Sequence, residues 1–253
     1  MDEPILSVKN LSKTFKLKGR EDVKAVSNVT FDLFPGETMG VIGESGSGKT
    51  TLVNLITGLL PATEGSVLLD GIEVTKCDGK ALRNVWKKMQ VVFQTPTESF
   101  DPRRTLGDGI CESLRNSGKD RMEALRRAKE LLTLCGLPED FVNRYPHEVS
   151  GGQCQRAAIA RALAIEPKLL ICDEATSALD VTIQAEIIEL LVKLREELDM
   201  SILFICHDIA LVQQFCNRVV VMYHGELVEE GIPNEVIAKP QNDYTQDLID
   251  SIL

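Results

Sequence analysis

The chain has 253 residues, of which 43% are hydrophobic and 26% charged; this composition favours one α/β domain, with or without an inserted lobe, and excludes a disordered chain. Its formal net charge of −10 argues against a protein that coats nucleic acid, because phosphate neutralisation needs a basic face. Seven cysteines without a CxxC pair, no signal-peptide-like start and no apolar run long enough to span a membrane favour a reduced cytoplasmic protein.

The first part of the chain has the pattern of short strands that lead into a glycine-rich loop. β-type alternation predicts strands at residues 5–8 and 25–33, and an apolar run predicts another at 38–42. This third strand ends directly at the loop. Beyond the loop, apolar residues at helical spacing predict an amphipathic helix over residues 49–60, which Pro61 would end.

The middle of the chain changes from strands to helices. Residues 65–74 are predicted to form a hairpin whose turn is Asp70-Gly71, and residues 91–93 form another short strand. From about residue 96 to residue 164 the apolar positions follow helical spacing instead. This block is interpreted as a helical lobe inserted into the α/β fold.

Strands and helices alternate again in the last third of the chain. Short apolar runs predict strands at 169–172, 202–206 and 219–223, separated by helices at about 182–198 and 209–216. Near-continuous apolar strands that alternate with helices are typical of a parallel sheet covered on both faces. The sequence therefore predicts a parallel α/β core.

Residues 43–50 match the P-loop pattern, GxxxxGK followed by Ser or Thr, at every position. Glycines let the backbone turn tightly so that successive N–H groups point at phosphate, and the following helix adds the positive end of its dipole. Lys49 would bind the β and γ oxygens, and the Thr50 hydroxyl would ligate Mg²⁺. The expected nucleotide-binding residues of this loop are Gly43, Ser45, Gly46, Ser47, Gly48, Lys49, Thr50 and Thr51.

Polar side chains also follow other predicted strands. Asp173 and Glu174 come after a buried strand, where α/β folds place ligands. Asp173 would hold Mg²⁺, and Glu174 would orient or deprotonate the attacking water. His207 follows the next strand and would reach the γ-phosphate, whereas His224 is interpreted as structural. Gln94, after a third strand, could approach both Mg²⁺ and the attacking water.

A further glycine-containing segment links the chain to a known family. Residues 149–153, Val-Ser-Gly-Gly-Gln, resemble the LSGGQ signature of ABC-type ATPases. The family's ordered set of motifs is completed by the P-loop, Gln94, Asp173-Glu174, Ser177-Ala178-Leu179-Asp180 and His207. The resemblance covers essentially the whole chain.

The resemblance implies a single ABC ATPase domain over residues 1–253, with ATP and Mg²⁺ as its ligands. Residues of about 1–95 and 165–253 would form the α/β P-loop core, which includes an N-terminal antiparallel β subdomain. Residues of about 96–164 would form the helical signature subdomain.

In this family two ATPase domains dimerise head to tail, so that each nucleotide lies between them. The resemblance therefore implies contacts with the partner's nucleotide by Ser150, Gly151, Gly152 and Gln153. The serine–glycine turn precedes an amphipathic helix, whose N-terminal dipole would also face phosphate. The segment that ends at Asp180 would touch the opposite subunit. Phe15 matches the aromatic position that stacks on adenine, although a core phenylalanine would give the same pattern.

Residues 93–103 are similar to the corresponding segment of oligopeptide, dipeptide and nickel importer ATPases, as are residues 174–185 and 243–248. This branch implies a subunit at the cytoplasmic face of the cell membrane. Its partners would be a second ATPase subunit, two membrane permeases and, indirectly, an extracytoplasmic solute-binding protein, with no nucleic acid. The region after Gln94 would receive a permease helix.

Two questions stay open at the level of sequence. The solute could be a peptide, or nickel and its metallophores. The chain could also be a soluble ABC-type ATPase subunit of an enzyme or assembly complex, of the phosphonate-breakdown or iron–sulfur type. Residues 95–103 favour the importer over that alternative.

Overall fold

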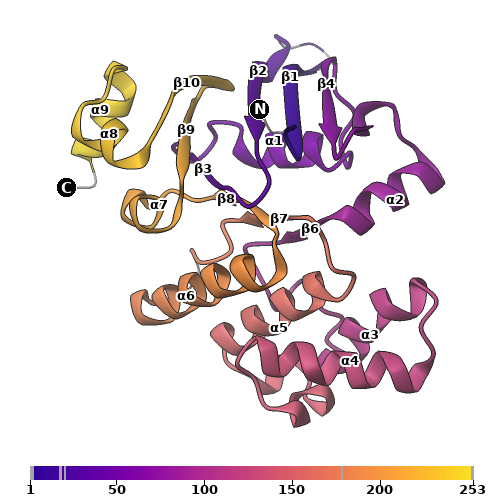
Figure 1. Cartoon of the computed structure of the whole chain (residues 1–253). Helices are drawn as coiled ribbons and strands as arrows, with labels where there is room; N and C mark the ends of the chain where they lie inside the picture. Colours follow the sequence, from indigo (N-terminus) through magenta and orange to yellow (C-terminus); the bar gives the residue numbers. More distant parts are fainter. Residues whose placement is uncertain (1–2, 17–18, 20, 178, 252–253) are drawn as a thin grey trace.

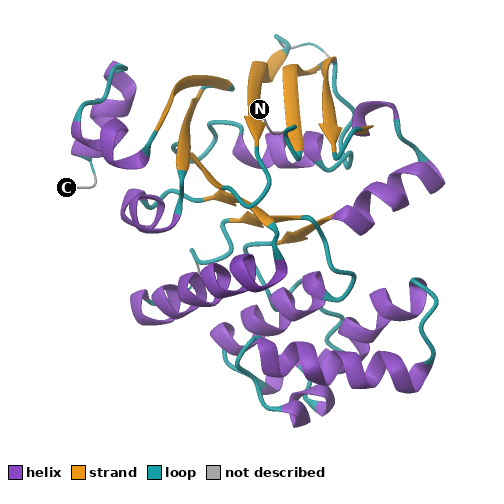
Figure 2. Ribbon diagram, viewed as in Figure 1, coloured by secondary structure: helices purple, strands orange, loops and turns teal. Residues whose placement is uncertain are grey.

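The computed structural model of the protein describes residues 3–16, 19, 21–177 and 179–251. Ala178, which lies in the predicted 177–180 segment, falls outside these residues. The described strands gather in two sheets, and helices lie around them (Figure 2). The helices are α1 (Lys49–Ile56), α2 (Gly79–Lys88), α3 (Leu106–Asn116), α4 (Arg121–Leu134), α5 (Gly151–Leu163), α6 (Val181–Leu198), α7 (Ile209–Phe215), α8 (Pro233–Ala238) and α9 (Asp243–Asp250), with short 3-10 turns at Val74–Lys76, Glu139–Asn143 and Pro146–Glu148.

The central sheet has the strand order β10-β9-β3-β8-β7-β6 (Figure 1). Its strands are β3 (Thr38–Ile42), β6 (Met89–Val92), β7 (Leu169–Asp173), β8 (Ser201–Ile205), β9 (Arg218–Tyr223) and β10 (Glu226–Gly231). Neighbours from β9 to β6 pair in parallel, whereas β10 joins β9 in antiparallel orientation. The predicted parallel core is confirmed.

Both faces of this sheet are buried. In β7, the side chains of Leu170 and Cys172 belong to the hydrophobic core that includes residues of α5 and α6, whereas those of Leu169 and Ile171 belong to the core under the second sheet. A strand buried on both faces needs an apolar residue at nearly every position, because successive side chains point to opposite sides. This is the physical reason for the continuous apolar runs in the sequence.

The second sheet has the order β2-β1-β4-β5 and is antiparallel. Its strands are β1 (Leu6–Phe15), β2 (Val23–Leu33), β4 (Glu64–Leu69) and β5 (Ile72–Glu73). The hairpin of β4 and β5 turns at Asp70 (φ 47°) and Gly71 (φ 75°), and two positive φ angles are typical of the tight hairpin turn predicted there. This sheet packs over α1, which lies beside it in Figure 1.

Helix α1 is shorter than predicted, because it ends at Ile56 and not at residue 60. Gly58 has φ 71°, and its N–H donates to the Leu55 carbonyl oxygen (3.2 Å). A glycine in the left-handed conformation just past the last turn is a common way to end a helix. The stop signal was therefore Gly58, which the sequence analysis overlooked in favour of Pro61.

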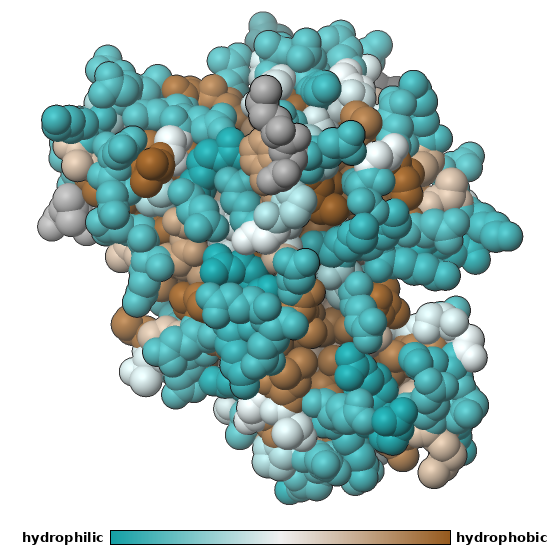
Figure 3. Space-filling view, in the orientation of Figure 1, coloured by the Kyte–Doolittle hydropathy of each residue, from teal (hydrophilic) through white to brown (hydrophobic). Residues whose placement is uncertain are grey.

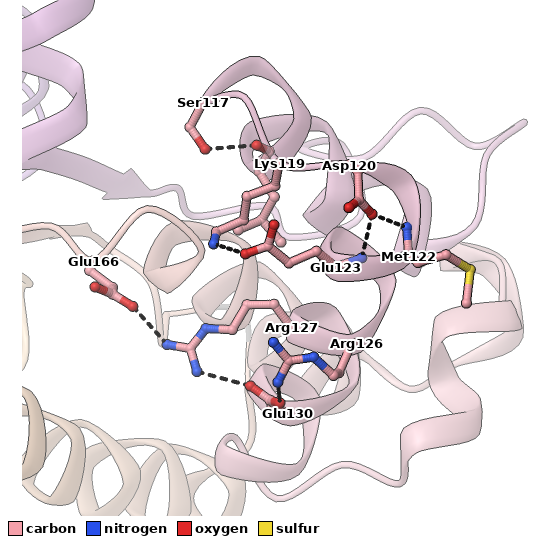
Figure 4. Close-up of polar contacts among 10 residues, drawn as sticks. Ser117, Lys119, Asp120, Met122, Glu123, Arg126, Arg127, Glu130 and Glu166 are labelled. Atoms are coloured by element: carbon pink, nitrogen blue, oxygen red, sulfur yellow. Dashed lines mark hydrogen bonds and ion pairs between the residues drawn. The ribbon is translucent and has the colours of Figure 1, made fainter.

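Helices α3, α4 and α5 form the lower right part of Figure 1, and their core is continuous with that of the central sheet. Figure 4 shows how polar contacts fix α4 within this part. Asp120 accepts two backbone N–H groups of the first turn, and Arg127 joins Glu130 (3.2 Å) to Glu166 (3.1 Å), which follows α5. Such exposed ion pairs contribute at most about 1 kcal/mol each, so they orient α4 more than they stabilise it.

None of the helices in the described part of the chain is long and apolar enough to cross a lipid bilayer. Hydrophilic residues cover most of the face seen in Figure 3. The cysteines are free thiols, and burial raises the pKa of Cys172 and of Cys206 to about 12. These two therefore behave as small apolar residues.

Candidate nucleotide-binding site

The predicted P-loop connects the carboxyl end of β3 to the start of α1, in the interior of the sheet. A Cβ on Gly43 (φ 152°) would lie 2.1 Å from the carbonyl oxygen of Met222 in β9. One on Gly48 (φ 107°) would lie 2.4 Å from that of Ala25 in β2. Backbone atoms of packed strands cannot move aside, so the neighbouring strands demand these glycines independently of any ligand.

Lys49 is the first residue of α1, and its side chain turns back into the loop. It is 4% exposed, and its Nζ donates to the carbonyl oxygens of Gly43 (2.7 Å) and Glu44 (2.8 Å). Burial holds the pKa of Lys49 below its usual value, although the carboxylates of Glu174 and Asp173 act in the opposite direction and raise it. The loop thus encloses a positive charge that faces two acidic residues.

The first turn of α1 is not capped by a side chain. Gly48 occupies the N-cap position, and within the described residues no side chain accepts a hydrogen bond from this turn. The turn also contains no acidic residue. The first N–H groups of a helix carry partial positive charge and need a partner, so this helix end is suited to an anion.

A cavity of about 510 Å³ lies over the loop and the start of α1. Its wall includes the loop residues Ser45, Gly46, Gly48, Lys49, Thr50 and Thr51. Gln94, after β6, and Glu174, after β7, complete this part of the wall. The structure therefore brings much of the predicted phosphate loop together with two of the predicted catalytic residues.

The rest of the wall contains residues that the sequence analysis did not assign to the site: Val23, Lys24, Ala25, His224 and Gly225. His224 was interpreted as structural, yet it lines this cavity directly after β9. The position at the carboxyl end of a strand is the same signal that singled out His207. Val23, Lys24 and Ala25 of β2 carry no such signal. They belong to the antiparallel sheet, and only the packing of the two sheets brings them to the cavity.

The residues expected to bind Mg²⁺ fit a cation. Asp173 is 7% exposed, and its Oδ1 has no hydrogen-bond partner among the described residues. Burial and the neighbouring Glu174 carboxylate raise the pKa of Asp173 to about 6, against the effect of Lys49. Among the described residues, no group of three or more His, Cys, Asp or Glu side chains is arranged to hold a metal ion. A single buried carboxylate such as Asp173 suits Mg²⁺, which takes few protein carboxylates and shares its other positions with water and phosphate.

Glu174 is held in an unusual backbone conformation, with φ 50°. Its N–H donates to the carbonyl oxygen of Ile205 at the end of β8 (3.0 Å). Its carbonyl oxygen accepts the Ser177 hydroxyl (2.9 Å), and the Ser177 oxygen in turn accepts the side-chain amide of Gln94 (3.2 Å). The ends of β6, β7 and β8 are thereby connected around the carboxylate.

His207 lies next to this cavity and is not among its lining residues. It lines a smaller one, of about 220 Å³, which shares Glu174 with the first and also includes Ser177. The structure therefore places His207 near the predicted catalytic carboxylate. Its contact with the γ-phosphate stays a prediction.

Phe15 is not a core residue, because its side chain is 37% exposed at the end of β1. The ring lies 5.3 Å from Nζ of Lys13, measured to the ring centroid. Phe15 pairs across the sheet with Val23, which lines the cavity, but is itself outside the lining. Adenine stacking stays a prediction, and the alternative of a core phenylalanine is excluded.

The serine–glycine turn is built differently from the phosphate loop. Ser150 is the N-cap of α5: its Oγ accepts the N–H of Gln153 (3.3 Å), and its own N–H donates to Oε1 of Gln153 (2.9 Å). Ser150 and Gly151 are exposed, whereas Gly152 is buried, and a Cβ there would lie 2.6 Å from Cγ2 of Ile183. Gly152 is thus needed for the packing of α5 on α6, a reason that sequence reasoning missed.

Asp180 is exposed and acts as the N-cap of α6, where its Oδ1 accepts the N–H of Ile183 (3.0 Å). This N-cap bond is a sufficient reason for an acidic residue at position 180 even in a single chain. Its proximity to an opposite subunit stays a prediction.

Comparisons with known proteins agree with this geometry. The family model described as ABC transporter matches residues 26–177. A Brucella ovis protein named as a peptide import ATP-binding protein is 41% identical over 99% of this chain and 79% of its own length. The oligopeptide transport ATP-binding protein OppF of Escherichia coli is 43% identical over 98% of this chain and 77% of its own.

A solved structure, a dimeric ATP-binding cassette in a post-hydrolysis state bound to ADP and phosphate, is 35% identical, with a TM-score of 0.82 over 90% of this chain and 98% of its own. The chain belongs to the ABC transporter family, as an ATP-binding and ATP-hydrolysing member that uses Mg²⁺. The predicted family, its fold, its ATPase class and the resemblance to the oligopeptide and dipeptide branch are confirmed.

Proposed function

We propose that the protein energises the import of peptides through two membrane permeases, and that ATP is hydrolysed in the cavity over the phosphate loop. One observation carries this proposal: a single cavity holds Lys49 of the loop together with Gln94 and Glu174. The names of the relatives, peptide import and oligopeptide transport, support the importer and favour peptides over nickel.

In this proposal the phosphates bind to the loop N–H groups, to the uncapped first turn of α1 and to the Lys49 ammonium. Thr50, Gln94 and Asp173 would hold Mg²⁺, which would supply positive charge near the phosphate oxygens. The buried, unpaired oxygen of Asp173 supports this assignment. Calorimetry of the purified chain with ATP and Mg²⁺ should give saturable heat; a folded chain that gives none would contradict the proposal.

Glu174 would orient the attacking water and accept its proton. The two hydrogen bonds that fix its backbone, to Ile205 and Ser177, limit the directions in which its carboxylate can point. His207 would approach the γ-phosphate from the neighbouring cavity. Phe15 would stack on the adenine beside Val23, where the cavity meets the second sheet.

A second subunit would complete the site. Helices α3, α4 and α5 would act as the signature subdomain that presents Ser150 and Gly151, both exposed, to the nucleotide of the partner. Asp180, also exposed, would lie at the same interface. The dimeric arrangement of the related cassette supports this proposal.

Complementation between variants tests the shared site. Lys49→Ala disables the phosphate loop, and Ser150→Ala disables the turn, so neither variant alone should hydrolyse ATP efficiently. A mixed dimer contains one intact loop opposite one intact turn. Restored turnover on mixing would show that this chain pairs with itself. If a sister ATPase is the partner, mixing the two variants should not restore turnover, which should return only when the sister ATPase is added.

The permease would bind at the segment after Gln94. A cavity of about 360 Å³ lies there, lined by residues of that segment, of α3 and by Arg161 of α5. The guanidinium of Arg161 lies 4.5 Å from the ring centroid of Phe100 and donates to the carbonyl oxygen of Ser99. A permease helix seated there would contact the segment and the helical part together, at the cytoplasmic face of the membrane.

Co-purification decides between the importer and the alternative of a soluble enzyme or assembly complex. The protein is extracted with detergent from cells that express it at native level, and the bound chains are identified. Two membrane-spanning permeases, with ATP hydrolysis stimulated by a peptide-loaded solute-binding protein, are expected. A stable complex with soluble enzymes only would reject the importer. Stimulation of ATP hydrolysis by nickel but not by peptides would reject peptides as the solute.

A further inference from the structure

Helix α9 contacts the phosphate loop, although the contacting residues are 200 positions apart in the sequence. The hydroxyl oxygen of Tyr244 accepts the backbone N–H of Glu44 at 2.9 Å. The carbonyl oxygen of the same Glu44 accepts the Lys49 ammonium at 2.8 Å. Glu44 thus connects the Tyr244 hydroxyl to the Lys49 ammonium, the positive charge that the loop encloses. Tyr244 also belongs to residues 243–248, the one importer-like segment whose role the site described above leaves unexplained.

The ring of Tyr244 is held in place by stacking. It lies on the ring of Tyr223, with centroids 3.9 Å apart and planes inclined by 25°. Tyr223 ends β9 and also contacts the ring of His224, at 4.1 Å between centroids. Because β9 pairs directly with β3, the strand that leads into the loop, this stack joins α9 to the rigid centre of the sheet. Offset aromatic pairs of this kind are worth about 0.5–1.5 kcal/mol beyond their burial.

Hydrogen bonds behind the ring anchor the start of α9. The Glu229 carboxylate of β10 accepts the N–H groups of Gln241 (2.9 Å) and Asn242 (3.1 Å). The side-chain oxygen of Asn242 accepts the N–H of Tyr244 (2.9 Å) and caps the helix. Leu248 fixes the following turn in the core. A continuous set of bonds therefore runs from the sheet edge to the phosphate loop.

We propose that Tyr244 is a positioning residue for ATP: its hydroxyl fixes the Glu44 peptide, and through it the loop that binds the phosphates. Glu44 is exposed, so without this acceptor its N–H would turn to water and the peptide would be free to rotate. A loop that must be ordered when nucleotide arrives binds it more weakly than a loop that is already ordered. The inference rests on the proposed phosphate site, which makes loop order relevant to ATP.

The test compares Tyr244→Phe with Tyr223→Phe. The first variant removes the acceptor and keeps the stacked ring. The second removes the hydroxyl of the other ring of the stack and leaves the Tyr244 hydroxyl and the stacked rings in place. In the nucleotide-free protein, Tyr244→Phe should speed hydrogen exchange of the Glu44 N–H by about tenfold, while Tyr223→Phe leaves it unchanged.

The affinity for ATP should fall when the Glu44 peptide loses its hydrogen bond to Tyr244. Tyr244→Phe should raise the Kd for ATP about three- to tenfold, with turnover at saturating ATP within about twofold of the parent. Unchanged exchange at Glu44, or a Kd equal to that of Tyr223→Phe, would overturn the inference. Failure of the parent to bind ATP would reject the proposed phosphate site instead, so the two failures are distinguishable.

A second variant keeps the inference falsifiable if the ring substitution disturbs packing. Glu229→Gln retains one acceptor oxygen for the start of α9, whereas Glu229→Ala removes both. Exchange at Glu44 should therefore increase more in Glu229→Ala than in Glu229→Gln. Equal exchange in the two variants would contradict the role of the bonds behind Tyr244.

Discussion

Two glycine-containing turns lead into helices in this protein, and they treat the helix end in opposite ways. The N-cap of α1 is Gly48, which offers no side-chain cap, whereas the N-cap of α5 is Ser150, and Ser150 and Gln153 cap each other. A capping box satisfies some of the N–H groups at a helix end, so the start of α5 has fewer of them left for a ligand than the uncapped start of α1. We infer that the phosphate loop binds nucleotide within its own chain, while the turn before α5 contributes exposed groups to a second subunit.

The glycines of the two turns also differ in what surrounds them. At Gly43 and Gly48 the nearest atoms are backbone carbonyls of packed strands, which cannot yield. At Gly152 the nearest atom is Cγ2 of Ile183, the branch methyl of a helical side chain whose χ1 is restricted, so relief would require α5 and α6 to shift slightly apart. The loop is therefore fixed by the sheet, and the turn by side-chain packing between two helices.

Glu174→Gln should have the largest effect and separates binding from hydrolysis. The amide cannot accept a proton from water, so turnover should fall about 10²-fold or more. Binding depends on the loop, so the Kd for ATP should stay within about threefold. The measurements are steady-state phosphate release and calorimetry, and an unchanged turnover would remove Glu174 from its role.

Asp173→Asn tests the buried carboxylate of Asp173, whose Oδ1 has no hydrogen-bond partner among the described residues. The pKa of Asp173 is raised to about 6, so the folded chain binds the proton more tightly than the unfolded chain does. The corresponding stability is present below about pH 4 and is lost as the pH rises through about 6. Without nucleotide or Mg²⁺, the variant should thus be more stable than the parent by about 2–3 kcal/mol at pH 7.5.

Urea unfolding of parent and Asp173→Asn at several pH values measures this difference directly, because other titrating groups cancel. The gap should narrow on going to pH 4.5. A gap of constant size would show that Asp173 does not titrate in this range.

Lys49→Ala should weaken ATP binding at least about tenfold, because a hydrogen bond from a charged group is worth about 1.5–3 kcal/mol. Thermal stability should change less, since the ammonium is buried and its removal also removes a desolvated charge. A filter-binding or calorimetric titration reports the Kd. Equal affinity in variant and parent would contradict the assignment of the loop.

Gly152→Ala should have the smallest effect and sharpens the contrast between the two turns. Its methyl group would displace Ile183, and we expect a loss of about 1–2 kcal/mol in the free energy of unfolding. Gly151→Ala is the matched control, because its nearest neighbour, Cδ2 of Leu179, lies at an ordinary 3.6 Å. The control should stay within about 0.5 kcal/mol of the parent. Two equally stable variants would show that Gly152 is not a packing residue.

Much of the phosphate site could be predicted because its signals are local. The pattern of residues 43–50, the apolar runs before Asp173 and His207, and the hairpin turn at Asp70-Gly71 all act within a few residues. Each depends on φ preferences, side-chain alternation or strand ends, which the neighbouring residues themselves determine. Even the error at the end of α1 was local, because Gly58 carried the signal.

Local patterns therefore predicted the parallel core and the phosphate loop, whereas no element was predicted for α2, β10, α8 or α9. Only the tertiary structure showed that His224 lines the cavity, that Gly152 makes room for Ile183 and that Tyr244 contacts Glu44. The physical reason is the same in each case. These contacts join segments far apart in the chain, and their geometry depends on how strands and helices pack, which no local preference specifies.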